Sequence, residues 1–211
     1  MHRHMDRIEH GEEERKFFNR LADEWDGNYV RDLPNAEYFA DLLELKGNED
    51  ILDVGTGTGV MIGFYERYLI TGHVHAVDIS DRMIELARKK YPASAHPNID
   101  FEVLDIYNLE QNGKYDVVVC NSCLPHFHDH KKAIEVLSGC LKNGGILMVA
   151  SSSREDINHV HMHHSAIIHH DIVPSIEELE GMFSAAGLTK TFSKSDKDHH
   201  IIIGKKLVTD Y

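Results

Sequence analysis

Ile51-Leu52-Asp53-Val54-Gly55-Thr56-Gly57-Thr58-Gly59-Val60 is the stretch of this sequence that decides the fold. A short apolar run ends in a carboxylate, and three glycines then alternate with two threonines before apolar residues resume. This order predicts a strand, a tight glycine turn and a helix. Glycine permits positive φ and leaves the main chain bare, so a ligand can lie against the turn at the positive end of the helix.

The spacing of the glycines separates two classes of cofactor. A dinucleotide fingerprint needs its third glycine at position 60. Val60 stands there instead, which argues against a nicotinamide oxidoreductase. The turn is therefore expected to bind a nucleoside of another kind.

The rest of the chain alternates between strand-like and helix-like segments. Strands are predicted at 51–54, 73–77, 99–104, 115–120 and 146–150, with helices at about 60–69, 81–91, 129–141 and 176–186. Two further strands, 188–192 and 199–204, are joined by a short polar link and predict an antiparallel hairpin. The expected fold class is α/β: a Rossmann-like doubly wound sheet of seven strands, mostly parallel, with a C-terminal antiparallel hairpin.

We expect a single domain over 1–211, with N-terminal lid helices within 12–45 and a histidine-rich helical insertion at 154–172. The chain has 211 residues, of which 42% are hydrophobic and 27% charged, and this composition is ordinary for one globular domain. A net charge of -13 without a basic cluster disfavours nucleic acid as a partner.

No apolar run approaches the roughly 18 residues of a membrane span, and the first residues lack the apolar core of a signal peptide. Three cysteines then fit a reducing cytoplasm. We therefore predict a cytoplasmic protein without a membrane partner, and a homodimer is an open alternative for its assembly.

Polar residues follow several predicted strands at the edge where open α/β sheets bind ligands. Asp78 ends the second strand, 25 residues after Asp53, and Asp105 and Asn121 follow the third and fourth. An acid at Asp78 suits both hydroxyls of a ribose and penalises a 2′-phosphate. Glycines, acids and strand ends together predict a nucleoside pocket.

The acid followed by glycines at every second position resembles motif I of the class I S-adenosylmethionine (SAM) methyltransferases. Tyr115–Val119 through Leu141–Gly145 resembles the type-11 methyltransferase pattern, and the likeness covers roughly residues 15 to 150. The family usually has proline where Asn143 stands, and often a histidine pair where Pro125-His126 stands. Phe17-Phe18-Asn19 and Trp25-Asp26 look like the family's N-terminal lid. The alternative for Trp25 is that it is simply a core residue that anchors the helix.

The resemblance implies SAM as cofactor and S-adenosylhomocysteine (SAH) as product. The glycine turn would hold the methionine portion and ribose, and Asp53 would anchor the ammonium end or organise the turn. Ile79 and Met83 would flank the adenine, Asp105 would receive its amino group beside Ile106, and Asn121 would approach the ammonium. The residues assigned to the cofactor are Asp53, Gly55, Thr56, Gly57, Gly59, Asp78, Ile79, Met83, Asp105, Ile106 and Asn121.

The chain has seventeen histidines, and many of them form two clusters, one after the fourth predicted strand and one in the insertion. One of them, first His126 and then His159 or His163, is a candidate general base, because imidazole titrates near neutrality. His159 and His163 stand i,i+4 and are an alternative metal pair, but no metal site is assigned. A third interpretation is a set of solvated surface residues.

Cys120-x-x-Cys123 has two interpretations as well: a small core residue at the end of a strand, or a thiol pair for a soft metal. The sequence as a whole predicts a SAM-dependent methyltransferase with a small-molecule acceptor. The alternative is a non-catalytic sensor on the same fold that binds SAM, a metal or a tetrapyrrole.

Overall fold

The computed structural model describes residues 7–29, 33–152, 154 and 172–208. Its helices and strands, in chain order, are α1 (Arg7–Leu21), η1 (Ala22–Glu24), α2 (Trp25–Tyr29), α3 (Leu33–Leu42), β1 (Asp50–Val54), α4 (Ile62–Tyr65), β2 (His73–Asp78), α5 (Asp81–Lys90), β3 (Ile99–Val103), η3 (Ile106–Asn108), β4 (Tyr115–Asn121), η4 (Leu124–His126), α6 (His130–Cys140), β5 (Leu141–Ser151), α8 (Ile176–Ala185), β6 (Leu188–Ser195) and β7 (His200–Lys206).

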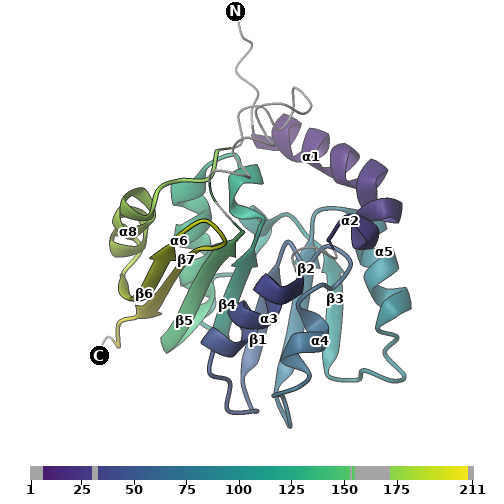
Figure 1. Ribbon diagram of the computed structural model, residues 1–211, viewed down its shortest axis with the longest axis horizontal. Coiled ribbons are helices and arrows are strands. Elements are labelled where there is room, and N and C mark those ends of the chain that lie inside the picture. The colour runs from purple at the N-terminus through teal and green to yellow at the C-terminus, as the bar shows by residue number, and fades with distance from the viewer. Residues whose placement is uncertain (1–6, 30–32, 153, 155–171, 209–211) are drawn as a thin grey trace, which may run out of the picture.

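The strands form one seven-stranded sheet in the order β3-β2-β1-β4-β5-β7-β6 (Figure 1). The pairs from β3 through β5 are parallel, and β7 runs antiparallel to both β5 and β6. The predicted fold class and the terminal hairpin are therefore confirmed. The strand order reverses between β1 and β4, so the carboxyl ends of these two strands flank the switch point where ligands bind.

Each face of the sheet carries its own hydrophobic core, because successive strand residues point to opposite faces. Along β4, Val117 and Val119 join the cluster that contains residues of α3, α4 and α5. Val118 and Cys120 join the cluster that contains residues of α6 and α8. Helices therefore cover both faces, and the central strands β1 and β4 are buried almost throughout.

Several predicted boundaries are wrong. The helix expected over about 60–69 is only the short α4, because the chain beyond it turns back: the N–H groups of Ile70, Thr71 and Gly72 all donate to the Gly47 carbonyl. The fifth strand was expected to start at residue 146 but β5 starts at Leu141. A bulge in its pairing with β4 absorbs Gly144, whose φ is +79°, inside the strand.

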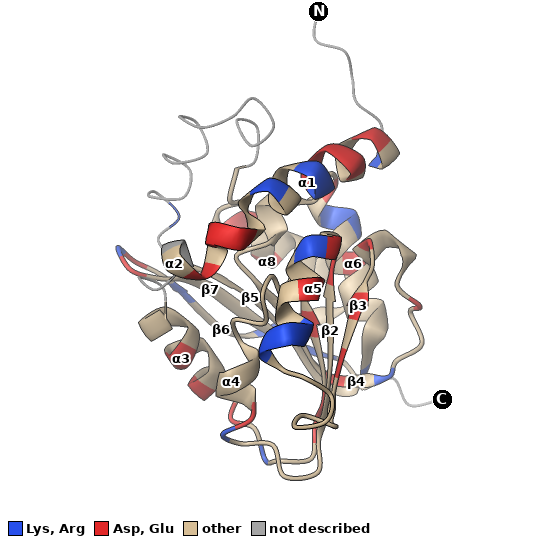
Figure 2. Ribbon diagram, turned by 90° about the vertical axis from the view of Figure 1, so that its right-hand side faces the viewer, with Lys and Arg blue, Asp and Glu red and all other residues tan. Residues whose placement is uncertain are grey.

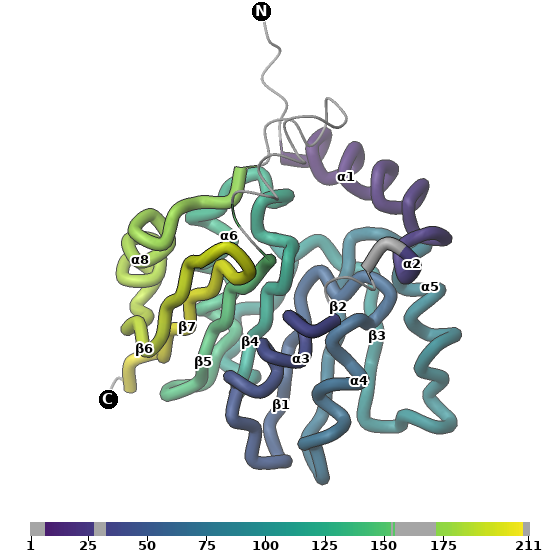
Figure 3. The backbone as a smooth tube through the Cα atoms, in the orientation of Figure 1, coloured from purple at the N-terminus to yellow at the C-terminus, as the bar shows by residue number. Residues whose placement is uncertain are grey.

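Helices α1 and α2 lie over the carboxyl ends of the parallel strands, with α1 crossing above the sheet, whereas α3 packs against one face of the sheet (Figures 1 and 3). Helix α1 begins at Arg7, five residues before the expected start at Glu12. Acidic and basic residues are interspersed along α1 and α5 (Figure 2), so the negative net charge is not gathered on these helices as one acidic face.

Most of the predicted insertion, residues 155–171 with His159 and His163, lies outside the described residues. The expected helix there stays a prediction. Within the described part of the chain, every helix is too short or too polar to cross a bilayer.

Candidate cofactor and acceptor site

The glycine turn adopts the conformation that its composition predicts. Gly55, Gly57 and Gly59 have φ values of +63°, +57° and +80°, which side chains rarely adopt. A Cβ on Gly55 would lie 2.5 Å from the Cβ of Cys123, and one on Gly57 would lie 3.3 Å from Trp25 Nε1. The turn is therefore enclosed by the segment after β4 and by the lid.

Asp78 is joined to the glycine turn by a hydrogen bond. Its Oδ2 accepts from the Gly57 N–H at 2.8 Å, and its Oδ1 accepts from the Ser80 N–H at 2.8 Å. Burial raises the pKa of this carboxyl, although the backbone bonds from Ser80 and Gly57 oppose the shift. These bonds hold the carboxylate in place at the pocket, and a carboxylate has the acceptor capacity that a diol requires.

Asp53 lies beneath the turn and is fully buried. It accepts from the Thr56 hydroxyl at 2.6 Å and from the Tyr65 hydroxyl at 3.1 Å. Burial raises the pKa of Asp53 to about 6, and the bonds from Thr56 and Tyr65 reduce the shift. The sequence left two roles open for Asp53, anchoring the ammonium end of the cofactor or organising the glycine turn. This geometry favours the second role.

Asp105 caps the short helix η3 at the carboxyl end of β3. Its Oδ1 accepts from the Tyr107 N–H at 3.0 Å, and its Oδ2 accepts from Arg7 at 3.0 Å. Arg7 belongs to α1, so the N-terminal helix is tied to the predicted adenine end of the site. Ile106 is buried beside this carboxylate.

One pocket gathers these residues and encloses about 1010 Å³ of space that is continuous with solvent. Ten of the eleven residues assigned to the cofactor line it: Asp53, Gly55, Thr56, Gly57, Asp78, Ile79, Met83, Asp105, Ile106 and Asn121. Gly59 does not line it, because a Cβ there would point at the Tyr91 ring at 2.9 Å. His126 lines the same pocket.

The wall opposite the glycine turn comes from α1 and from the segment after β4. His126 Nδ1 lies 3.8 Å from Glu14 Oε2, and His10 Nε2 donates to the His126 carbonyl at 2.9 Å. The Phe18 ring meets the His126 ring edge-on at 5.0 Å between centroids. His10 and His128 lie 5.4 Å apart, centroid to centroid.

Sequence reasoning missed the first turns of this wall, namely Arg7, His10, Gly11 and Glu14, all of which line the pocket. The helix was expected only from Glu12, on apolar spacing alone. A signal does exist in the sequence: Arg7, Gly11, Glu14 and Phe18 recur every three to four residues and so share one helical face.

The cysteine pair is part of the core. Cys120 and Cys123 are both buried, their sulfurs lie 2.9 Å apart, and the Cys123 thiol donates to the Val54 carbonyl at 3.1 Å. Burial raises the pKa of Cys123 well above its usual value. Because a metal is bound by the thiolate, this environment favours the structural interpretation.

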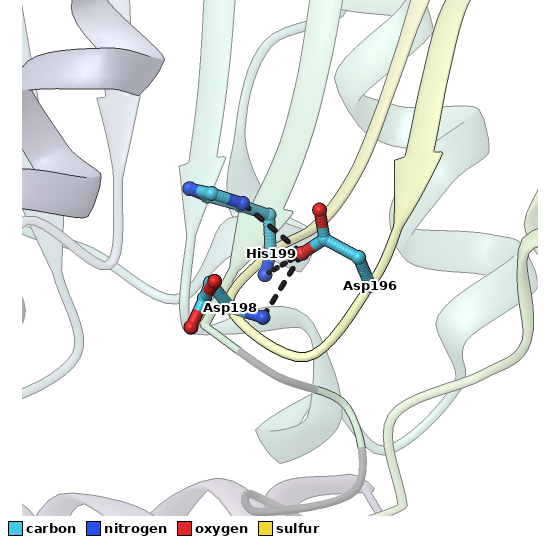
Figure 4. A group of neighbouring side chains, drawn as sticks. All are labelled: Asp196, Asp198 and His199. Carbon is cyan, nitrogen blue, oxygen red and sulfur yellow. Dashed lines mark hydrogen bonds and ion pairs between the residues drawn. The ribbon is translucent and has the colours of Figure 1, made fainter.

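The described residues also contain one close group of metal-ligand types, at the turn between β6 and β7 (Figure 4). Asp196 Oδ1 accepts from the N–H groups of Asp198 and His199, at 2.9 and 2.8 Å, and from His199 Nδ1 at 3.1 Å. These bonds, first among them that of Asp198, hold the pKa of Asp196 well below its usual range. The Asp196 carboxylate therefore closes the turn between β6 and β7, and this explains why the three side chains lie close together.

Comparison with known proteins identifies the family. Residues 45–202 match the family model of a methyltransferase domain, which covers most of the chain. A putative methyltransferase, 235L, of Invertebrate iridescent virus 6 is 31% identical over 126 residues, 60% of this chain and 45% of its own length. The malonyl-[acyl-carrier protein] O-methyltransferase of Acetivibrio thermocellus is 32% identical over 146 residues, 68% of this chain and 50% of its own.

A solved structure agrees at the level of the fold. Magnesium protoporphyrin IX methyltransferase of Synechocystis PCC 6803, solved with SAH, superposes with a TM-score of 0.73 at 17% identity, over 93% of this chain and 99% of that one. The chain spans about half the length of the first curated relatives that it matches.

The chain therefore belongs to the methyltransferase-domain family. The resemblance to methyltransferases that the sequence predicted is confirmed at the level of the family.

Proposed function

We propose that this chain transfers the methyl group of SAM to a small-molecule acceptor held between α1 and the carboxyl end of β4. The observation that carries this proposal is the bond from the Gly57 N–H to Asp78 at 2.8 Å, inside the pocket. It places a bare glycine turn and a diol-accepting carboxylate side by side, at the point where the strand order reverses.

The pocket residues fit the parts of the cofactor in sequence along the sheet edge. The main chain of Gly55 to Gly57 suits the methionine portion, Asp78 the ribose hydroxyls, and Asp105 with Ile106 the adenine. When bound, SAM supplies an electrophilic methyl group on a sulfonium. The chain's own contribution is to hold the acceptor atom in line with that methyl group and to exclude water.

His126 is the proposed general base for an acceptor that arrives protonated. It lines the pocket beyond the glycine turn and lies under α1. His159 and His163 stay second choices from sequence. The names of two relatives, a malonyl-[acyl-carrier protein] and a ubiquinone biosynthesis O-methyltransferase, support transfer to a small acceptor. Cytoplasmic location and a homodimer stay predictions from sequence.

Calorimetry with SAH tests the cofactor site. Asp78→Asn removes a charged acceptor from the diol, and loss of one such bond is worth about 1–3 kcal/mol, so the affinity for SAH should fall about 5- to 150-fold. Asp100→Asn is the matched control, because its side chain is 75% exposed on β3. Unchanged affinity in Asp78→Asn would remove the proposed ribose contact.

Turnover is tested by a methyl-transfer screen with labelled SAM across phenols, amines, thiols, carboxylates and tetrapyrroles. Transfer to at least one class supports the proposal. Binding of SAH without transfer to any class would favour the non-catalytic sensor instead. In that case, metal analysis of untagged protein and of a His159/His163 variant tests the metal-binding form of the alternative.

A further inference from the structure

We infer that Glu14 is the positioning residue for His126, and that the pair selects an aromatic acceptor with a neutral hydroxyl group. The inference rests on the proposed function, because it assigns the acceptor side of the same pocket. Glu14 and His126 are 112 residues apart in the sequence and meet only through the fold.

Glu14 is an unusual residue for its position. It lies on α1 with only 3% of its surface exposed, and it faces the pocket. A carboxylate is almost never buried to this degree unless a charged or hydrogen-bonding group lies close by, because desolvation of the charge is costly. One group within reach is the imidazole of His126, whose Nδ1 lies 3.8 Å from Glu14 Oε2.

The contacts of His126 bear on which of its two ring nitrogens accepts the proton of the acceptor. The His10 ring donates to its backbone carbonyl, and the Phe18 ring packs edge-on against the imidazole at an interplanar angle of 81°. In the proposed pair, Nδ1 keeps its proton on the side of the Glu14 carboxylate, and Nε2 takes the proton of the acceptor. The distance of 3.8 Å is longer than a hydrogen bond, and catalytic contacts of this kind shorten in the ternary complex.

Charged groups around His126 disfavour an anionic acceptor. Glu14 faces it from α1, and Asp78 interacts with it electrostatically from the end of β2. Among the described residues, the other charges and histidines of the pocket are Asp53, a further acid, the Arg7–Asp105 pair, which is internally neutralised, and His10 and His128. A free carboxylate acceptor would meet two acids and would have no proton for a base to remove.

The walls of the acceptor side are aromatic. Phe18 of α1 and Phe127, which follows η4, both line the pocket, and so do His126 and His128. Aromatic rings pack favourably against such walls, and a hydroxyl on the ring would reach the imidazole edge. A phenol-type hydroxyl satisfies both the walls and the base.

The step balances with the residues present and the cofactor. The acceptor hydroxyl gives its proton to His126 Nε2, its oxygen forms the bond to the methyl carbon, and the bond between carbon and sulfur breaks with its electrons left on sulfur. The positive charge that leaves the sulfonium is replaced by one on the imidazole. Glu14 then faces an imidazolium and stabilises it.

The test compares Glu14→Gln, Glu14→Asp and the control Glu12→Gln, a side chain on the same helix that is 50% exposed. Initial rates are measured with SAM and paired phenols and benzoates of the same ring. We expect Glu14→Gln to lower kcat about 10- to 100-fold, a part of what a general base contributes, with the KM for SAM changed less than about 2-fold. Glu14→Asp should recover part of the loss, and Glu12→Gln should match the wild type.

Nitrogen NMR of the imidazole rings in the SAH complex measures the tautomer of His126 without turnover. The His126 signal is assigned by its loss in His126→Gln. We expect a single Nδ1–H tautomer in the wild type and a mixture of tautomers in Glu14→Gln. Unchanged tautomers, or a loss in kcat that Glu12→Gln shares, would overturn the role of Glu14. Methylation of the benzoates in preference to the phenols would overturn the acceptor class. If no compound is methylated while the tautomer shift is seen, the proposed function fails and the pairing stands.

Discussion

Replacing Gly55 by alanine adds a methyl group where the structure has no space for it. Gly55 has a φ of +63°, and its Cβ would lie 2.5 Å from the Cβ and 2.9 Å from the sulfur of Cys123. Cys123 is held by its bond to the Val54 carbonyl. The left-handed conformation costs about 1–2 kcal/mol and overpacking about 1–3 kcal/mol, so we expect the free energy of unfolding to fall by about 2–5 kcal/mol.

Two other glycines separate the two contributions. Gly187 has a φ of +75° but has nothing within 4 Å of its Cβ position, so Gly187→Ala should show the conformational cost alone, about 1–2 kcal/mol. Gly181 lies in α8, also with nothing within 4 Å and without positive φ. Gly181→Ala should be neutral or stabilising by up to about 1 kcal/mol, because alanine is the better helix former.

The assay is urea unfolding followed by circular dichroism, with thermal melting as a second measurement at about 2–4 °C per kcal/mol. A Gly55→Ala value within about 0.5 kcal/mol of Gly187→Ala would refute the steric argument. The double variant with Cys123→Gly should recover stability, since it removes the Cβ that lies closest to the added methyl group. The double variant with Cys123→Ala keeps that Cβ and should recover much less.

Three further predictions concern single positions. Trp25 is the chain's one tryptophan and lines the pocket, so its fluorescence should change saturably on titration with SAH but not with NAD. The raised pKa of Asp53 means that the folded state binds its proton more tightly: the stability from this group is full below about pH 3.8 and is lost as pH rises through about 6. The unfolding free energy of wild type minus that of Asp53→Asn should therefore decrease over this range, and a flat difference would contradict the shift. Ser175→Ala breaks a capping box seen in full and should cost about 1 kcal/mol by urea unfolding, whereas the exposed Ser184→Ala should cost almost nothing.

Features set by neighbouring residues were predictable from the sequence. The glycine turn and the strand ends at Asp78 and Asp105 depend on residues a few positions apart, and all three were expected. The sheet followed because strands that alternate with helices leave few arrangements. The pocket edge could therefore be predicted from local patterns and one topological rule.

Features that depend on distant contacts were not predictable. Arg7 reaches Asp105 across 98 residues, and His10 reaches His126 across 116. Polar residues at the start of a helix look solvated from sequence, since nothing nearby indicates that the helix will be laid over a pocket. The same reason explains why Glu14 was passed over although its spacing from Phe18 places both on one face.

The cofactor side and the acceptor side of the pocket are connected through the N-terminal helices. Ser80, whose N–H donates to Asp78, gives its hydroxyl hydrogen bond to Asn19 of α1 at 2.6 Å. Asn19 and Glu14 are five residues apart on one helix, about 7.5 Å along its axis. Whatever holds Asn19 against the start of α5 therefore also holds Glu14 against His126. If the proposed function is right, the contacts that fix Asp78 also position the acceptor side of the pocket, and Ser80→Ala should then alter the rate of methyl transfer although Ser80 does not contact the acceptor.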